Sequence, residues 1–274
     1  MTLSFAWVRQ VQSVEELVFA SDSRLRFGCS WDCCPKVFPL PRGDSAICFA
    51  GDTMYAYPLI TQIKSVIEHH RRSLSRAQDL TDFKGHLLRV ASDMCEQIDD
   101  LPTGQRTPDD PDAGFLLGGY SWKLRRFVLW TLHFDPHIKK FTFRPARKWR
   151  GVEGKRVLAV LGNSVDKAKT RLVNLLKKRG KLASGGLDME PFEVLRDMIR
   201  DRVDPTIGGP PQVAKVYRYM STMTYGVWWP NRDEGKVTLL GRSLLDYEKV
   251  QNLVLDPDSL QSEPTWTYDG DVAG

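Results

Sequence analysis

The sequence contains no run of about 18 apolar residues, the length that a membrane-spanning helix requires. Its first residues also lack the basic start and the apolar stretch of a secretory signal peptide. Cysteine is scarce, with 5 in 274 residues, and an odd number fits a reducing compartment better than a disulfide framework. These absences favour a cytoplasmic protein with no membrane segment.

The chain has no strong excess of charge of either sign. Its 39 basic and 34 acidic side chains leave a formal charge of +5, and the two signs are mixed along the sequence. Since no basic stripe dominates, nucleic acid is not expected as the main partner. The hydrophobic content of 42% and the 8 tryptophans suffice for a sizeable core, which argues against wholesale disorder.

Three cysteines are crowded together, which raises the alternative of a metal site. They are Cys29, Cys33 and Cys34. No second Cys/His pair follows at the spacing of a zinc finger, so buried or half-buried thiols are favoured. No metal and no cofactor is therefore expected.

The hydrophobic periodicity divides the chain into strands, two helices, strands, two helices and strands. Strands are expected at 3–8, 17–22, 36–40, 46–50, 115–120, 126–134, 138–144, 156–161, 213–219, 222–229 and 236–241. Helices are expected over the apolar positions 56–67, over 83–98 after Thr81 as N-cap, over 164–179 and over 190–203.

The paired helices decide the expected fold class. Two consecutive helices cannot be single crossovers of a doubly wound parallel sheet, and they are better placed as layers that cover two mostly antiparallel sheets. Beyond about residue 255 the sequence is acidic and polar. We therefore expect one domain over residues 1–254 and a loosely ordered tail over 255–274.

Thr2, which follows the initiator Met1, is the first candidate for chemistry. Its small side chain suits removal of Met1, which would make Thr2 the N-terminal residue. An N-terminal threonine combines a hydroxyl nucleophile with an α-amine whose reference pKa is about 8, so part of the amine is unprotonated near neutral pH. Taken alone, Thr2 is more simply an ordinary first residue.

Three further motifs follow Thr2 in order. Asp22 ends an apolar strand in Phe-Ala-Ser-Asp-Ser-Arg, Lys36 begins the next strand, and Gly51 follows an alanine between a strand and a helix. The ordered set resembles proteasome β subunits and their bacterial ring-forming relatives. Those proteins share a Thr-initiated first strand, an Ala-Asp-Ser-Arg-like segment, a lysine on the third strand and an Ala-Gly before the first helix.

The resemblance implies a four-layer αββα sandwich of the N-terminal-nucleophile hydrolase type, and it implies a role for each residue. Thr2 would be the nucleophile. Lys36 would lower the proton affinity of the Thr2 amine and hydroxyl by its positive charge. Asp22 would pair with Lys36, and the backbone N–H of Gly51 would face the oxyanion.

Two later segments match the same family with departures. Asn163 stands where the family has the serine of a Gly-Ser-Gly turn, although Asn163 or the adjacent Ser164 can still form hydrogen bonds. Asp204 stands where the family has an aspartate before the last strands, and it would help to orient the Thr2 amine. Ile207 replaces a second serine and cannot form a side-chain hydrogen bond, which bears on activity more than on fold.

The sequence thus predicts an N-terminal-threonine amidohydrolase, specifically a peptidase in which Thr2 attacks an amide carbonyl. The resemblance further implies a peptide or protein substrate, a ring-forming homo-oligomer and an ATPase unfoldase as partner. The alternative is a catalytically inactive scaffold or binding subunit of the same fold, which Ile207 favours.

Two weaker candidates remain open. His133 and His137 bracket a turn, but no Gly-x-Ser-x-Gly elbow accompanies them, so a hydrolase triad is not favoured. The basic segment 144–156 contains Trp149, and cations with an aromatic ring can bind single-stranded nucleic acid. A loop or a contact with a neighbouring subunit is the simpler interpretation of that segment.

Overall fold

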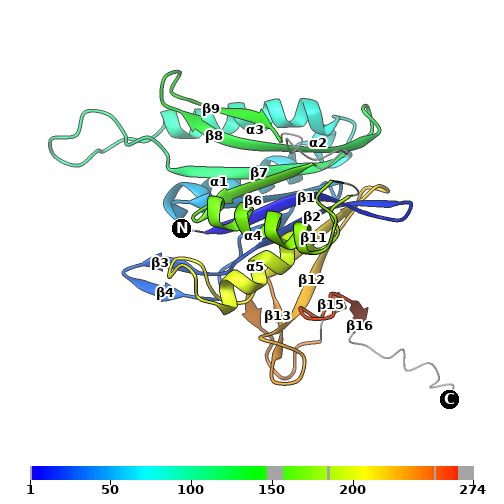
Figure 1. Ribbon diagram of the computed structural model, residues 1–274. Coiled ribbons are helices and arrows are strands. Elements are labelled where there is room, and N and C mark those ends of the chain that lie inside the picture. Colours follow the sequence, from blue (N-terminus) through cyan, green and yellow to red (C-terminus); the bar gives the residue numbers. More distant parts are fainter. Residues whose placement is uncertain (1, 147–156, 184–185, 250, 265–274) are drawn as a thin grey trace, which may run out of the picture.

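The computed structural model of the chain describes residues 2–146, 157–183, 186–249 and 251–264. Over those residues the fold is mixed, with two large and mostly antiparallel sheets, a small two-stranded hairpin and five helices. Figure 1 shows the larger sheets stacked on each other, with helices on their outer sides. The two consecutive helix pairs thus cover sheets, as the hydrophobic periodicity predicts.

The five-stranded sheet carries one pair of long helices. Its order is β5 (Val37–Pro39), β6 (Ser45–Gly51), β7 (Ala113–Ser121), β8 (Arg126–Asp135) and β9 (Lys140–Pro145). Helices α1 (Thr53–His69) and α3 (Leu80–Glu96), joined through the short α2 (Arg71–Leu74), pack on this sheet. Apolar side chains such as Ile60, Phe83 and Phe115 form the core between them.

The N-cap of α3 differs from the expected Thr81. Asp79 caps the helix because its carboxylate accepts hydrogen bonds from both Thr81 N, at 2.9 Å, and Thr81 Oγ1, at 2.7 Å. The threonine hydroxyl therefore supports the cap instead of forming it.

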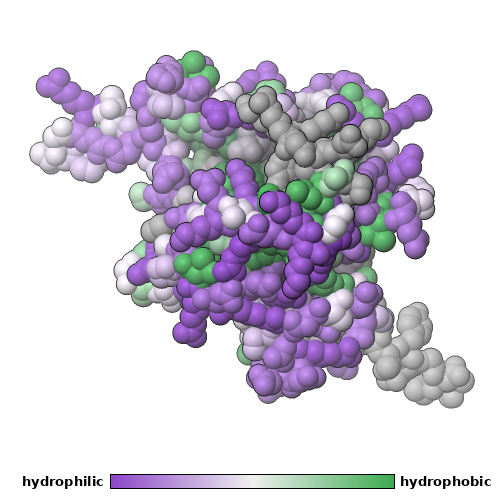
Figure 2. All heavy atoms as spheres, viewed as in Figure 1, coloured by the Kyte–Doolittle hydropathy of each residue, from purple (hydrophilic) through white to green (hydrophobic). Residues whose placement is uncertain are grey.

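The nine-stranded sheet carries the second helix pair. Its main order is β10 (Leu158–Gly162), β1 (Leu3–Val11), β2 (Val14–Ser21), β11 (Gln212–Tyr217), β12 (Ser221–Trp229), β13 (Lys236–Leu239) and β14 (Arg242–Ser243), with β15 (Leu253–Leu255) and β16 (Ser262–Pro264) joined at β12. Helices α4 (Val165–Lys178) and α5 (Glu190–Arg200) pack on it. On the face in Figure 2, hydrophilic residues cover these two helices and apolar residues form small separate patches.

Strand β2 shows why residues 17–20 form a continuous apolar run in the sequence. Val18 and Ala20 pack in the core against α4 and α5, whereas Leu17 and Phe19 pack between the two sheets. Successive side chains of a strand point to opposite faces, so a strand that is buried on both faces needs apolar residues at every position.

Some expected details are corrected by the structure. The four-layer αββα sandwich holds only at the coarse level of a mixed fold with helices on antiparallel sheets, because the molecule is mostly sheet and β13 and β16 extend beyond the helices. A hairpin of β3 (Leu25–Phe27) and β4 (Cys29–Trp31) was not expected. Residues 262–264 pair as β16, within the segment predicted as a loose tail, while 265–274 lie outside the described residues.

No helix in the part of the chain that the structure describes is long and apolar enough to cross a membrane. The crowded cysteines are free thiols, with Cys29 exposed and Cys34 buried. Within the described ranges, no group of three or more His, Cys, Asp or Glu side chains is placed to hold a metal ion.

Candidate active site

The centre of the candidate site is a buried ion pair between Asp22 and Lys36. Both side chains have 0% of their surface exposed, and Lys36 Nζ donates to Asp22 Oδ1 at 3.0 Å. The same oxygen accepts from Leu3 N at 3.0 Å, while Oδ2 accepts from Arg24 N and Gly208 N, both at 3.1 Å. Asp22 thereby ties Lys36 to the residue that follows Thr2.

The electrostatics of Lys36 follow from this burial. Desolvation lowers the pKa of Lys36 below its ordinary value, while the charge of Asp22 and its hydrogen bond oppose that shift. A buried ammonium without such a partner would lose its proton. The Asp22 carboxylate therefore opposes the loss of the Lys36 proton inside the molecule, at the start of β1.

Thr2 lies directly before β1 and is fully buried. Its carbonyl oxygen accepts a hydrogen bond from Asn163 N at 2.6 Å. Gly162 has a φ of 114°, and a Cβ at that position would lie 1.9 Å from the same oxygen, so only glycine fits there. Met1, whose removal the predicted chemistry requires, lies outside the described residues.

Asp204 lies at the centre of a second hydrogen-bonded group. Its Oδ2 accepts from Ser164 Oγ at 2.7 Å, and its Oδ1 accepts from Thr206 N at 2.8 Å and from Thr206 Oγ1 at 2.6 Å. Partial burial opposes ionisation, but the hydrogen bonds from Thr206 and Ser164 outweigh it and lower the pKa of Asp204. Ser164 follows Asn163, so the chain links this group to the surroundings of Thr2.

The structure shows the surroundings of Ile207 and Asn163, the two residues that depart from the family motif. Ile207 is only 2% exposed and packs in the core against α4 and α5, so it contributes no polar group. Two hydroxyls donate to Asp204. One is from Thr206, next to Ile207, and the other is from Ser164, next to Asn163. Sequence reasoning noted Ser164 and missed Thr206, although its neighbouring hydroxyl was a usable signal.

Gly51 ends β6 in a conformation that few other residues adopt. Its φ is 109°, and a Cβ there would lie 2.1 Å from the Asp112 carbonyl oxygen. The same carbonyl accepts from Asp52 N at 2.6 Å. The Asp52 carboxylate then caps α1 by accepting from Met54 N at 2.9 Å. The strand end and the helix start are thus held against the segment that leads into β7.

Gln212 is a buried residue of this region that the sequence did not single out. Its Oε1 accepts from Lys36 N at 2.9 Å and from Val37 N at 3.2 Å. Its Nε2 donates to Ser23 Oγ at 2.9 Å and to the Cys34 carbonyl at 2.7 Å. One side chain on β11 therefore positions both chain segments that carry the ion pair, and no short motif in the sequence signals this role.

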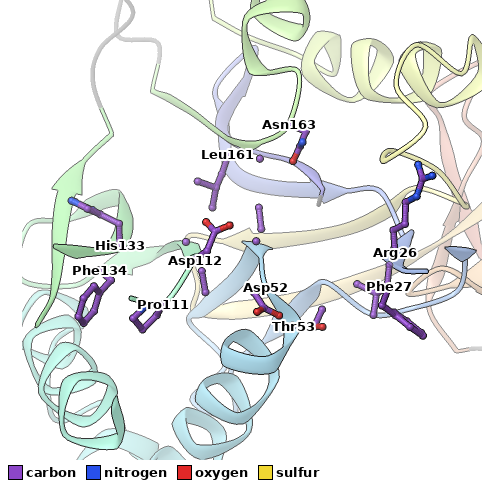
Figure 3. A pocket seen from close by; sticks show the side chains of 16 residues that line it. Arg26, Phe27, Asp52, Thr53, Pro111, Asp112, His133, Phe134, Leu161 and Asn163 are labelled. Atoms are coloured by element: carbon purple, nitrogen blue, oxygen red, sulfur yellow. The ribbon is translucent and has the colours of Figure 1, made fainter. Parts of the chain in front are cut away.

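A cavity of about 570 Å³ opens beside these elements. Figure 3 shows that its walls come from strand ends and turns of both sheets. The lining residues are Leu25, Arg26, Phe27, Ala50, Gly51, Asp52, Thr53, Pro111, Asp112, Ala113, Gly114, His133, Phe134, Leu161, Gly162 and Asn163. A ligand in this cavity would lie between Gly51 and Asn163, next to the chain segment of Thr2.

The structure places the two weaker candidates, His133 and His137, in different surroundings. His133 lines the cavity, and partial burial followed by the charge of Arg144 lowers its pKa. His137 does not line it and lies in the exposed turn after β8. Most of the basic segment, residues 147–156, lies outside the described residues.

Comparison with known proteins gives a likeness of fold. No protein-family model matches the chain, and no curated protein matches it. Among solved structures the chain is similar to the Anbu complex from Pseudomonas aeruginosa, which was solved as a helical assembly. The TM-score is 0.54 at 15% sequence identity, and the match covers 86% of this chain and 86% of that chain.

These comparisons overturn the family that the motifs predict. Assignment to proteasome β-subunit-like N-terminal-nucleophile hydrolases is wrong on these findings, because no family model supports it. The likeness found is to the Anbu complex at 15% identity, and the molecule is mostly sheet. Motifs of three to five residues recur by chance, since turns of many folds use the same Gly, Asp and Ser residues. The likeness establishes the fold alone.

Proposed function

We propose that the chain is an N-terminal-threonine amidohydrolase that cleaves peptides. The observation that carries the proposal is the fully buried Asp22–Lys36 pair, bonded to the backbone of Leu3. Burying an ammonium is costly, and a structural role would be served as well by apolar residues of similar size. A cation held next to the first residues of the chain suits the activation of an N-terminal nucleophile.

The proposed reaction follows the chemistry of an N-terminal threonine. After Met1 is removed, the Thr2 hydroxyl oxygen attacks the amide carbonyl, and the Thr2 amine accepts the hydroxyl proton directly or through a water. The C–N bond then breaks, the leaving amine takes the proton, and an ester to Thr2 remains. Water hydrolyses the ester, which releases the carboxylate product and regenerates Thr2.

Each neighbouring residue has a proposed part in that reaction. Lys36 lowers the proton affinity of the Thr2 amine by its charge. The Gly51 N–H stabilises the oxyanion with the N-terminus of α1 behind it, and Asn163 lies beside Thr2. Asp204, held by its own hydrogen bonds, orients the amine.

The test begins with the intact mass of the purified chain, which should be lower by one methionine. The wild type and the Thr2→Ala and Lys36→Ala variants are then compared on a peptide library. We expect Thr2→Ala to abolish turnover and Lys36→Ala to lower it by about 100-fold or more, the scale of a lost acid–base contribution. Equal turnover in all three proteins, above a mock preparation, would remove Thr2 from the mechanism.

A second candidate is a binding or scaffold subunit without activity. Ile207 favours it, because this buried side chain supplies no hydroxyl where the motif has a serine. Retention of Met1 in the intact mass, together with no turnover by the wild type, would select this alternative.

The proposal includes assembly of several copies of the chain, supported by the fold shared with the Anbu complex. A ring rather than a helical arrangement, an ATPase partner and a cytoplasmic location remain predictions from the sequence.

A further inference from the structure

The Asp112 carboxylate lies in the middle of the cavity. Figure 3 shows it between Leu161 and Asp52, with Gly51 and Gly162 lining the same space. The side chain is exposed, and among the described residues its carboxylate makes no hydrogen bond or ion pair. The side chain is therefore available to a ligand.

The position of Asp112 is fixed by its backbone and not by its side chain. Its carbonyl accepts from Asp52 N at 2.6 Å, and the next residue, Ala113, pairs with Gly51 in the sheet. Asp112 is thus held next to Ala113, which pairs with Gly51, the proposed oxyanion donor. A substrate carbonyl at the Gly51 N–H would have its neighbouring side chain within reach of Asp112.

A second carboxylate adds to the negative charge in the part of the cavity around Asp112. Asp52 lies beside Asp112, and its carboxylate caps α1. The cation among the lining residues, Arg26, comes from β3 on the opposite side of the cavity in Figure 3. Burial lowers the pKa of His133, which disfavours a positive charge on this ring beside the carboxylates.

We propose that Asp112 selects peptides with a lysine or arginine side chain beside the scissile amide. The inference rests on the proposed amidohydrolase function and adds its substrate class. Pro111 and Phe134 line the cavity near Asp112 and offer an apolar surface for the stem of a basic side chain, while the charged head meets the carboxylate. An acidic neighbour of the scissile bond would be repelled by the same group.

The experiment uses matched peptides that carry lysine, acetyl-lysine or glutamate at either position flanking one scissile bond. Acetyl-lysine keeps the stem and removes the charge. The kcat/KM values are measured for the wild type, for Asp112→Asn and for a control, Asp110→Asn. Asp110 is two residues away, pairs with Lys139 at 2.8 Å and does not line this cavity.

We expect the wild type and Asp110→Asn to prefer lysine over acetyl-lysine by about tenfold, the value of one charge-assisted contact. Asp112→Asn should reduce that ratio to near one, because it lowers kcat/KM for the lysine peptide more than for the acetyl-lysine peptide. A ratio near one in the wild type, or a ratio that Asp112→Asn leaves unchanged, would overturn the inference.

Binding measured without turnover separates this inference from the proposed function. The Thr2→Ala chain, with and without Asp112→Asn, is titrated with fluorescent forms of the same peptides. Thr2-dependent cleavage without charge preference defeats the Asp112 inference alone. Lysine-selective binding that depends on Asp112, in a chain that never cleaves, supports Asp112 recognition and defeats the proposed function. Binding without charge preference, in a chain that never cleaves, defeats both.

Discussion

At the scale of residues, the candidate site contains a connected group of buried polar side chains. Asp22 accepts four hydrogen bonds, and Gln212 bonds to the segments on either side of it. Each group satisfies the others, which is the condition under which buried charge is tolerated. The loss of one member leaves the polar atoms that it contacted buried without that partner.

Replacement of Asp22 by leucine should therefore destabilise the fold strongly. We expect a loss of about 3–5 kcal/mol in the free energy of unfolding, because the buried Lys36 ammonium loses the carboxylate that opposes its charge. Urea denaturation followed by circular dichroism measures this loss. The double variant Asp22→Leu/Lys36→Met should recover part of the stability while remaining inactive, and a double variant as unstable as the sum of the singles would contradict the pairing.

At the scale of elements, the site is built where strands end. β6 ends at Gly51 and β10 ends at Gly162, and both glycines have a positive φ and a carbonyl oxygen within about 2 Å of where a Cβ would stand. These two glycines let strand ends from different sheets approach other backbone segments closely. The cavity lies between them because the chain turns away from the sheet at both points.

A pair of Gly→Ala substitutions tests this point. Gly51→Ala should destabilise by more than about 2 kcal/mol, since the left-handed conformation and the Asp112 carbonyl both exclude a side chain. Gly85, inside α3, has open space around its Cβ position, so Gly85→Ala should stabilise by about 1 kcal/mol. Thermal unfolding of both variants gives the comparison, and equal shifts of the same sign would contradict the geometry.

At the scale of the whole molecule, two sheets pack face to face and each carries helices on its other side. The fold is shared with the Anbu complex, which was solved as a helical assembly. Several large apolar side chains remain exposed on hairpins at the surface, including Phe27, Trp31 and Tyr219. Such surfaces commonly serve as contacts between proteins.

We expect the purified chain to form particles of several copies. Light scattering coupled to size-exclusion chromatography gives their mass, and electron microscopy separates closed rings from helical assemblies. A single species with the mass of one chain across the accessible concentration range would contradict the assembly that we propose.

Much of the element order follows from the sequence alone. The spacing of apolar residues over 56–67 and 83–98 predicts α1 and α3, and the apolar run at 17–22 predicts β2, because these local patterns must bury their faces. The sequence also gives Asp22 and Lys36 as candidates, through the ordered set of short motifs that resembles proteasome β subunits.

The tertiary structure alone decided which side chains meet. It placed the Asp22 carboxylate between Leu3 and Lys36, bonded Asp204 to Thr206 and Ser164, and brought Gln212 beside Lys36. It also showed a molecule that is mostly sheet, where the sequence predicted four regular layers. Local periodicity fixes which face of an element is buried, but contacts between residues far apart in sequence depend on the register and twist of two packed sheets, which no local pattern records.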